Sequence, residues 1–109
     1  MIFVDTTEWV AAIDASDELH EDGKAVVEAL VKGKLPLAAT TDFVLGETMT
    51  LLKKRGAKPN KIVETIQLIL SSPRVNLLFV DAMLFKESLA SFARYARLSF
   101  TDATTLTAM

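Results

Sequence analysis

The strongest constraint on the fold of this chain is an alternation between short, almost wholly apolar runs and longer segments with helical periodicity. The runs at 2–4, 35–40 and 75–80 are typical of parallel strands that are covered on both faces. The helical segments are 6–13, 17–31, 42–55, 59–72, 82–97 and a last one from 100 onward. Strands that alternate with helices predict βαβ units. We therefore expect an α/β fold, a three-layer α/β/α sandwich with a short parallel sheet.

The size of the chain limits it to one core. Its 109 residues, half of them hydrophobic, are predicted to form a single domain over residues 1–109. No apolar stretch reaches the ~20 residues of a membrane span, and the N-terminus lacks the basic region of a signal peptide. We expect a cytoplasmic protein with no membrane partner. The absence of cysteine excludes disulfides and thiolate metal sites, and the single histidine argues against a histidine-rich one.

The charges are divided unevenly along the chain. Residues 1–31 carry eight acids and one base, whereas residues 32–109 carry six acids and eleven bases. This division is not that of a uniform polyanion binder, and it could serve solubility alone. The densest basic patch consists of Lys53, Lys54, Arg55, Lys58 and Lys61. It could hold a phosphate backbone, although basic residues in the last turn of a helix also complement the helix dipole.

Several polar residues have a simple structural explanation as helix caps. The candidate capping residues, in chain order, are Thr6 or Thr7, Ser16 or Asp17, Thr41 or Asp42, Asp81, and Ser99. His20 lies in an acidic stretch and is predicted to face solvent, whereas Trp9 is predicted to lie in the core or in an interface.

Three other acids are candidates for chemistry. Asp5 ends the first strand, where ligands bind in open parallel sheets, although it could instead cap the next helix. Glu47 lies within the apolar arc of its helix, so its charge requires a cation or a basic partner, unless it lies at the edge of that arc. Asp102 lies in the first turn of the last helix, where it could act only as the acid of a capping box with Ser99.

The three acids together suggest a metal site. Each is a hard oxygen ligand, and each lies on a different element with a route to one crevice at the strand ends. Such a cluster suits Mg²⁺ or Mn²⁺. The associated chemistry is metal-assisted hydrolysis of a phosphodiester.

Three segments resemble the PIN domain family and, within it, the VapC-type toxin ribonucleases. They are residues 2–7 (IFVDTT), 40–48 (TTDFVLGET) and 98–103 (LSFTDA). The resemblance implies an α/β/α sandwich with a parallel sheet and a Mg²⁺- or Mn²⁺-dependent endoribonuclease. The family's first three acids match Asp5, Glu47 and Asp102, and its small hydroxyl residue, which orients the first acid or a water, matches Thr6 or Thr7.

The resemblance also implies partners. VapC-type members cleave structured RNA such as tRNA or rRNA, pair with an antitoxin that enters the active-site groove, and commonly form homodimers. We expect RNA as the substrate, a cognate antitoxin and a homodimer. The residues expected to bind the RNA backbone are Lys53, Lys54, Arg55, Lys58, Arg94 and Arg97.

The chain also departs from the family pattern. The family carries a fourth acid after a further strand, and this sequence stops at Met109 before such a strand could form. The link at 95–98 is also shorter than usual. We therefore expect the last strand and the fourth acid to be missing, with apolar surface at Phe100, Leu106 and Met109 left for association, for which domain exchange is one route. The alternative reading is a catalytically impaired PIN-like remnant that binds RNA or a partner protein without cleaving; an unrelated α/β metal binder is a third.

Overall fold

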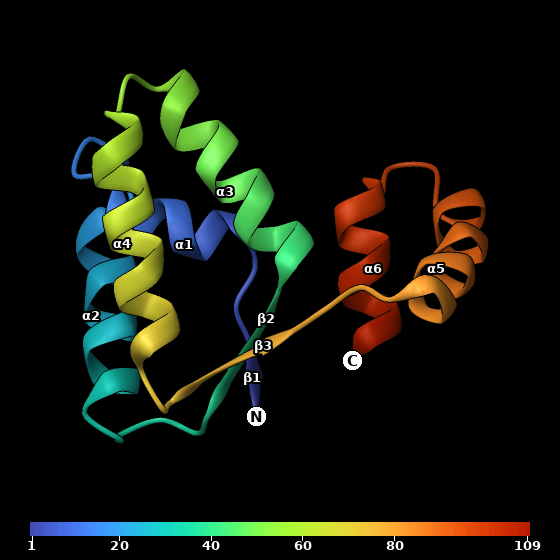
Figure 1. The fold of residues 1–109 in the computed structure, drawn as a ribbon, viewed down its shortest axis with the longest axis horizontal. Helices are drawn as coiled ribbons and strands as arrows, with labels where there is room; N and C mark the ends of the chain where they lie inside the picture. The colour runs from blue at the N-terminus through green and yellow to red at the C-terminus, as the bar shows by residue number, and fades with distance from the viewer.

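A three-stranded parallel sheet lies at the centre of the molecule (Figure 1). The computed structural model describes all of residues 1–109. The strands are β1 (Ile2–Phe3), β2 (Ala38–Thr41) and β3 (Val75–Leu78), in the order β1-β2-β3. Ile2 pairs with Ala38, and Ala38 pairs with Val75. All three strands run upward in Figure 1, so their carboxyl ends meet at the upper edge of the sheet.

Six helices surround the sheet and confirm the predicted three-layer arrangement. They are α1 (Thr6–Ile13), α2 (His20–Val31), α3 (Asp42–Lys54), α4 (Pro59–Ser71), α5 (Ala82–Arg94) and α6 (Phe100–Ala108). Figure 1 shows α1, α2 and α4 on one side of the sheet and α5 and α6 on the other, with α3 rising above the upper strand ends. No helix combines the length and the apolar character that a membrane crossing requires.

The hydrophobic core lies in the first two thirds of the chain. Its ten buried residues all fall between Val4 and Ile66, and the largest of them, Trp9, is 1% exposed. Trp9 Nε1 donates to Thr40 Oγ1 over 3.1 Å, and that hydroxyl donates to the carbonyl of Val4 over 3.0 Å. The core position predicted for Trp9 is confirmed. We call residues 2–78, with β1–β3 and α1–α4, the body.

The last two helices, which we call the C-terminal pair (residues 82–108), pack differently. Their fully buried residues are small: Ser88, Ala103 and Thr104. The aromatic ring of Phe100 contacts the rings of Phe43, Phe85 and Phe92, at centroid distances of 6.1, 4.9 and 5.9 Å. Because Phe43 belongs to α3, Phe100 joins the pair to the body.

The ends of several elements differ from the prediction for identifiable reasons. β3 stops at Leu78, short of the predicted Val80, because its partner strand turns into α3 and Asp42 Oδ1 accepts the Val80 N–H instead. Thr41, and not Asp42, caps α3, because Thr41 Oγ1 accepts the Val44 N–H at 3.1 Å. α5 stops at Arg94, three residues early, where Tyr95 is extended. Asp81 and Ser99 cap α5 and α6 as predicted.

The turn between α1 and α2 is longer than predicted. α2 begins at His20, because Asp14 and Asp17 hold residues 14–19 in turns through their side chains. His20 does not face solvent as predicted: it is half-buried, and its Nδ1 lies 2.8 Å from the carbonyl of Ala11. The two helices approach closely at Gly23, where an added Cβ would lie 2.8 Å from the backbone nitrogen of Ala12. Glycine is therefore required there by the close approach of the helices.

Candidate functional site

A polar cavity of about 260 Å³ lies at the carboxyl end of β1. Only two of its ten lining residues are hydrophobic, whereas the apolar hollow between α1 and α2 has eight hydrophobic residues out of twelve. The cavity is lined by Asp5, Thr6, Thr7, Val10, Asp17, Glu47, Leu51, Arg55, Ser99 and Asp102. The structure thus brings the three predicted acids and both predicted threonines to one place.

Asp5 fulfils a structural role and retains a free oxygen. Its Oδ1 accepts the N–H of Thr7 at 3.1 Å and of Glu8 at 3.4 Å, so Asp5 caps α1, and the prediction that Thr6 or Thr7 does so is wrong. Its Oδ2 has no hydrogen-bond partner and is available to a ligand. Burial raises the pKa of Asp5, the Thr7 N–H opposes that shift, and the charge of Asp102 adds to it. The two carboxylates therefore repel each other across the cavity.

Glu47 reaches the cavity from α3. It is half-buried, which agrees with a position at the edge of the apolar arc, and it makes no hydrogen bond or ion pair. The salt bridge that was an alternative explanation of this residue is absent. Because Leu51 and Arg55 follow at intervals of four residues, all three line the cavity from one side of the helix.

Asp102 reaches the cavity from α6. Ser99 Oγ accepts the Asp102 N–H at 3.0 Å, which is one half of the predicted capping box. The other half is missing, since the Asp102 carboxylate accepts no backbone hydrogen bond and remains exposed. That carboxylate is free for a ligand, and its place depends on the neighbouring Phe100, which fixes the start of α6 against α3.

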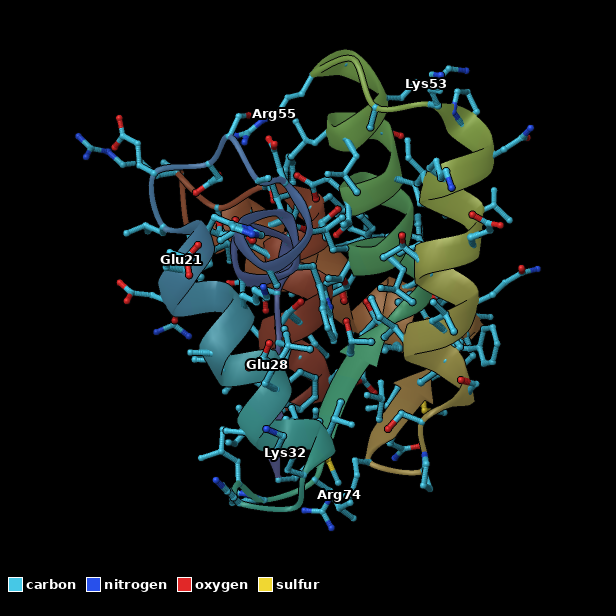
Figure 2. All side chains as sticks on the ribbon, turned by 90° about the vertical axis from the view of Figure 1, so that its left-hand side faces the viewer. Glu21, Glu28, Lys32, Lys53, Arg55 and Arg74 are labelled. Atoms are coloured by element: carbon cyan, nitrogen blue, oxygen red, sulfur yellow. The ribbon has the colours of Figure 1, made fainter.

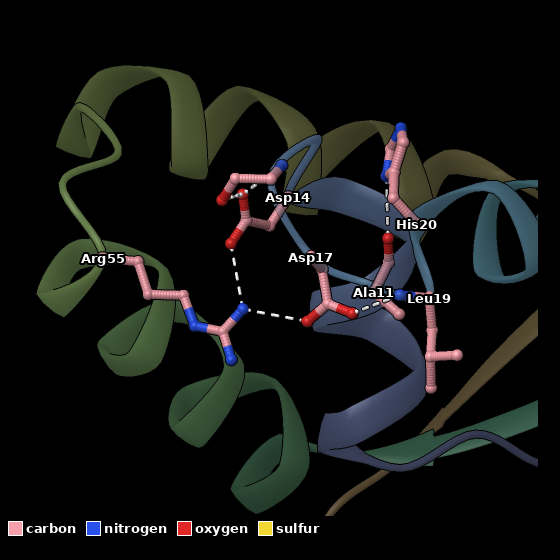
Figure 3. Close-up of polar contacts among 7 residues, drawn as sticks. Ala11, Asp14, Asp17, Leu19, His20 and Arg55 are labelled. Carbon is pink, nitrogen blue, oxygen red and sulfur yellow. Dashed lines mark hydrogen bonds and ion pairs between the residues drawn. The ribbon is translucent and has the colours of Figure 1, made fainter.

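Arg55 provides the only positive charge among the lining residues. Its Nη1 lies 3.0 Å from Asp14 Oδ2 and 2.9 Å from Asp17 Oδ2, both in the turn between α1 and α2 (Figure 3). The pKa of Asp14 falls to about 2, first through the Ser16 hydroxyl and then through Arg55. The pKa of Asp17 is lowered first by the Leu19 N–H and then by Arg55. Asp14 could not be singled out from the sequence, and Asp17 only as a candidate helix cap, because nothing local indicates a partner about forty residues away.

The other basic residues expected to bind RNA do not line the cavity. Figure 2 shows Lys53 and Arg55 at one end of the molecule and Arg74 at the opposite end. Lys53, Lys54 and Lys58 are exposed around the connection from α3 to α4 and do not line the cavity. Arg94 and Arg97 lie at the turn from α5 to α6, and Arg94 stacks over the ring of Tyr95 at 5.5 Å.

The donor set suits a hard divalent cation, but the side chains do not form a closed site. Asp5 Oδ2, Glu47 and Asp102 offer carboxylate oxygens without competing partners, and such oxygens are the usual protein ligands of Mg²⁺ and Mn²⁺. No group of three acidic or histidine side chains is close enough to hold a metal ion as the residues stand. The residues therefore fit such a cation by chemistry, and a bound ion would draw them together against their mutual repulsion.

The family model of the PIN domain matches residues 2–109, so the chain belongs to the PIN domain family. It is similar to the 23S rRNA-specific endonuclease VapC20 of Mycobacterium tuberculosis, with 36% identity over 112 residues in both strain CDC 1551 and strain H37Rv. That alignment covers 100% of this chain and 80% of VapC20. The crystal structure of M. tuberculosis VapC20, a toxin that cleaves the sarcin–ricin loop, superposes with a TM-score of 0.85 and 33% identity. It covers 100% of this chain and 81% of that one, which confirms the fold.

Proposed function

We propose that this protein is a Mg²⁺- or Mn²⁺-dependent endoribonuclease of the VapC type that hydrolyses RNA phosphodiesters. The observation that carries the proposal is the meeting of Asp5, Glu47 and Asp102 in one polar cavity, each with a carboxylate oxygen that nothing else uses. Similarity to VapC20 along the whole chain supports the same class of reaction.

The residues of the cavity have different proposed roles. Asp5, Glu47 and Asp102 would hold the cation, which would supply Lewis acidity for activating water and for stabilising the leaving oxygen. Asp5 is held in place by its cap on α1, so its free oxygen has a fixed direction. The hydroxyl groups of Thr6 and Thr7 also line the cavity and accept no backbone N–H. They are suited to orient Asp5 or a water molecule beside it.

We propose the partners of this protein by analogy with VapC20. VapC20 acts on 23S rRNA at the sarcin–ricin loop, and we propose a structured RNA as the substrate of this chain too. A VapC-type toxin implies a cognate antitoxin. The exposed Leu89, Phe92, Leu106 and Met109 of the C-terminal region support association into a homodimer.

The first experiment is an RNA cleavage assay with Mn²⁺, with EDTA, and with the Asp5→Asn variant. Asparagine caps a helix about as well as aspartate, so this variant removes the ligand charge and retains the cap on α1. We expect cleavage that requires Mn²⁺ and falls at least about 100-fold in the variant, corresponding to about 2.7 kcal/mol of transition-state stabilisation. Cleavage that survives both EDTA and the substitution would contradict the proposal.

The stability of the same variant is a built-in control. Because the folded pKa of Asp5 is raised, its ionised form is disfavoured, so stability falls as the pH rises through that pKa. Asp5→Asn should therefore melt at the same temperature as the wild type or slightly higher at pH 7. A large loss of melting temperature would show that lost activity reflects unfolding.

A second candidate function is supported by one observation. The three carboxylates share a cavity without forming a closed metal site, which would also fit a PIN-like remnant that binds RNA or a partner protein but does not cleave. Folded protein that binds RNA and never cleaves it, with any divalent cation, would favour this alternative.

A further inference from the structure

We propose that Arg55 binds a phosphate group of the RNA at the rim of the acid cavity, and that Asp14 and Asp17 are positioning residues that hold its side chain there. This inference rests on the proposed action on RNA. It assigns a separate role to one member of the basic patch, the only one that lines the cavity.

The cavity needs a cation to admit a polyanion. Its lining includes four carboxylates, those of Asp5, Asp17, Glu47 and Asp102, and a single base, Arg55. A phosphate that approaches these carboxylates is repelled unless positive charge compensates. Divalent cations can compensate at the three free acids, and Arg55 is the only side chain of the lining that itself carries a positive charge.

The backbone places Arg55 at a fixed point. It is the capping residue at the end of α3: its N–H donates to the carbonyl of Leu51, and the next N–H, that of Gly56, donates to the carbonyl of Lys53. Gly56 follows with φ 97°, a conformation that glycine adopts without strain, and turns the chain toward α4. Since Glu47 lies eight residues earlier, the guanidinium group extends from a point about 12 Å along the helix from the acid.

Asp14 and Asp17 are themselves fixed before they contact Arg55. Asp14 Oδ1 accepts the N–H and the hydroxyl of Ser16 at 3.0 and 2.7 Å, and Asp17 Oδ1 accepts the Leu19 N–H at 2.9 Å (Figure 3). Each aspartate then uses its second oxygen for Arg55. Both side chains are thus anchored in the turn, and they restrict the conformations open to the guanidinium group.

The contacts with Asp14 and Asp17 leave the Nε–Nη2 edge of the Arg55 guanidinium group free to bind a ligand. An arginine has five N–H donors, and both hydrogen bonds of Arg55 start from Nη1. The remaining edge, with Nε and Nη2, has no partner, and the side chain is 44% exposed. Two parallel N–H groups on one edge are the geometry that binds a phosphate in a bidentate manner. Stability alone is a weak explanation, because exposed ion pairs contribute little.

The inference is tested with Arg55→Gln, Arg55→Lys and the double variant Asp14→Asn/Asp17→Asn, with Lys32→Gln as the matched control. Lys32 is an exposed base that ends α2 before Gly33, as Arg55 ends α3 before Gly56, and it does not line the cavity. A labelled RNA stem-loop is used for KM and kcat, and its Kd is measured over a range of salt concentrations in an Asp5→Asn background. Thermal melting by circular dichroism checks the fold of each variant.

We expect Arg55→Gln to raise KM and Kd about 10-fold with kcat within about 2-fold, and to reduce the salt dependence by about one phosphate contact. Arg55→Lys should restore the salt dependence but not the full affinity, because lysine lacks the second donor. The double aspartate variant should raise KM with a normal salt dependence, since the charge remains but is no longer held. Lys32→Gln should change KM less than 3-fold.

The outcomes separate this inference from the proposed function. If the wild type cleaves RNA and Arg55→Gln behaves like Lys32→Gln, the role of Arg55 is refuted and the proposed nuclease activity stands. If the wild type binds RNA without cleaving it and Arg55→Gln weakens that binding, the role of Arg55 stands and the nuclease does not. If Arg55→Gln only lowers the melting temperature, the cluster is structural and the inference fails. If the wild type binds no RNA, both fail.

Discussion

The body and the C-terminal pair are built from similar helices but are packed in different ways. All ten residues of the core cluster lie in the body, between Val4 and Ile66. The pair and the residues beside it expose as many large apolar side chains as the rest of the chain, which is more than twice as long: Phe79, Met83, Phe85, Leu89, Phe92, Tyr95, Leu106 and Met109. Stability therefore comes mainly from the body, because buried apolar surface is the dominant favourable contribution to folding.

The candidate site does not follow that division. The body supplies Asp5, Glu47 and Arg55, whereas the pair supplies Ser99 and Asp102. A site assembled from a tightly packed region and a loosely packed one depends on their docking. Changes in the pair should therefore affect activity more than stability, and core changes in the body should do the reverse.

The largest expected effect tests where stability resides. Leu52 is 2% exposed in the body, whereas Leu89 is 49% exposed in the pair. Leu52→Ala should lower the free energy of unfolding by about 3 kcal/mol, because it leaves a cavity in the core. Leu89→Ala should lower it by less than about 1 kcal/mol. Urea denaturation followed by circular dichroism measures both, and equal losses would contradict the comparison.

The next prediction concerns docking. Phe100→Ala removes the ring that joins Phe43 of α3 to Phe85 and Phe92 of α5, so Asp102 should shift relative to Asp5. A displacement of about 1 Å in a catalytic group can cost about 100-fold in rate, and we expect a loss of that size in cleavage. The control is Phe79→Ala, whose ring is 68% exposed. Unchanged cleavage by the folded Phe100→Ala variant would show that the site tolerates movement of the pair.

The smallest effect is a pH dependence within the body. The folded pKa of Asp14 is about 2, below its ordinary value of 3.8, so its stabilising contribution is present above about pH 4 and is lost as the pH falls toward 2. Asp14→Asn lacks this contribution. The difference in stability between the wild type and this variant should be small at pH 5 and should vanish near pH 2, as measured by urea denaturation at each pH. A difference that persists at pH 2 would mean that another interaction had been lost.

Much of the fold could be predicted because it depends on local patterns. The apolar runs located all three strands, and Pro59 and Ser99 marked helix starts that the structure confirms. The last residue of β3 and the first residue of α2 could not be predicted from such patterns. Each is set by a side chain that takes over a backbone N–H, Asp42 in one case and Asp17 in the other.

The candidate site shows the same limit. The order of the three acids along the chain pointed to them, and the structure places them in one cavity. From the sequence, Asp5 is a candidate both for capping α1 and for binding a ligand. In the structure its Oδ1 caps the helix, and its second oxygen is free for a ligand. The contacts of Arg55 could not be predicted, because the pattern of a helix end does not reveal which of three consecutive bases will find a distant carboxylate.

The hydrogen bonds of Trp9 have a practical consequence for studying this molecule. Trp9 is the only tryptophan and lies wholly within the body, in a chain of hydrogen bonds that ends at Val4, one residue before Asp5. The only tyrosine, Tyr95, follows α5 at the far side of the sheet. Each region therefore carries its own natural fluorophore, and the emission of the two can distinguish loss of the body from detachment of the last helices without any added label.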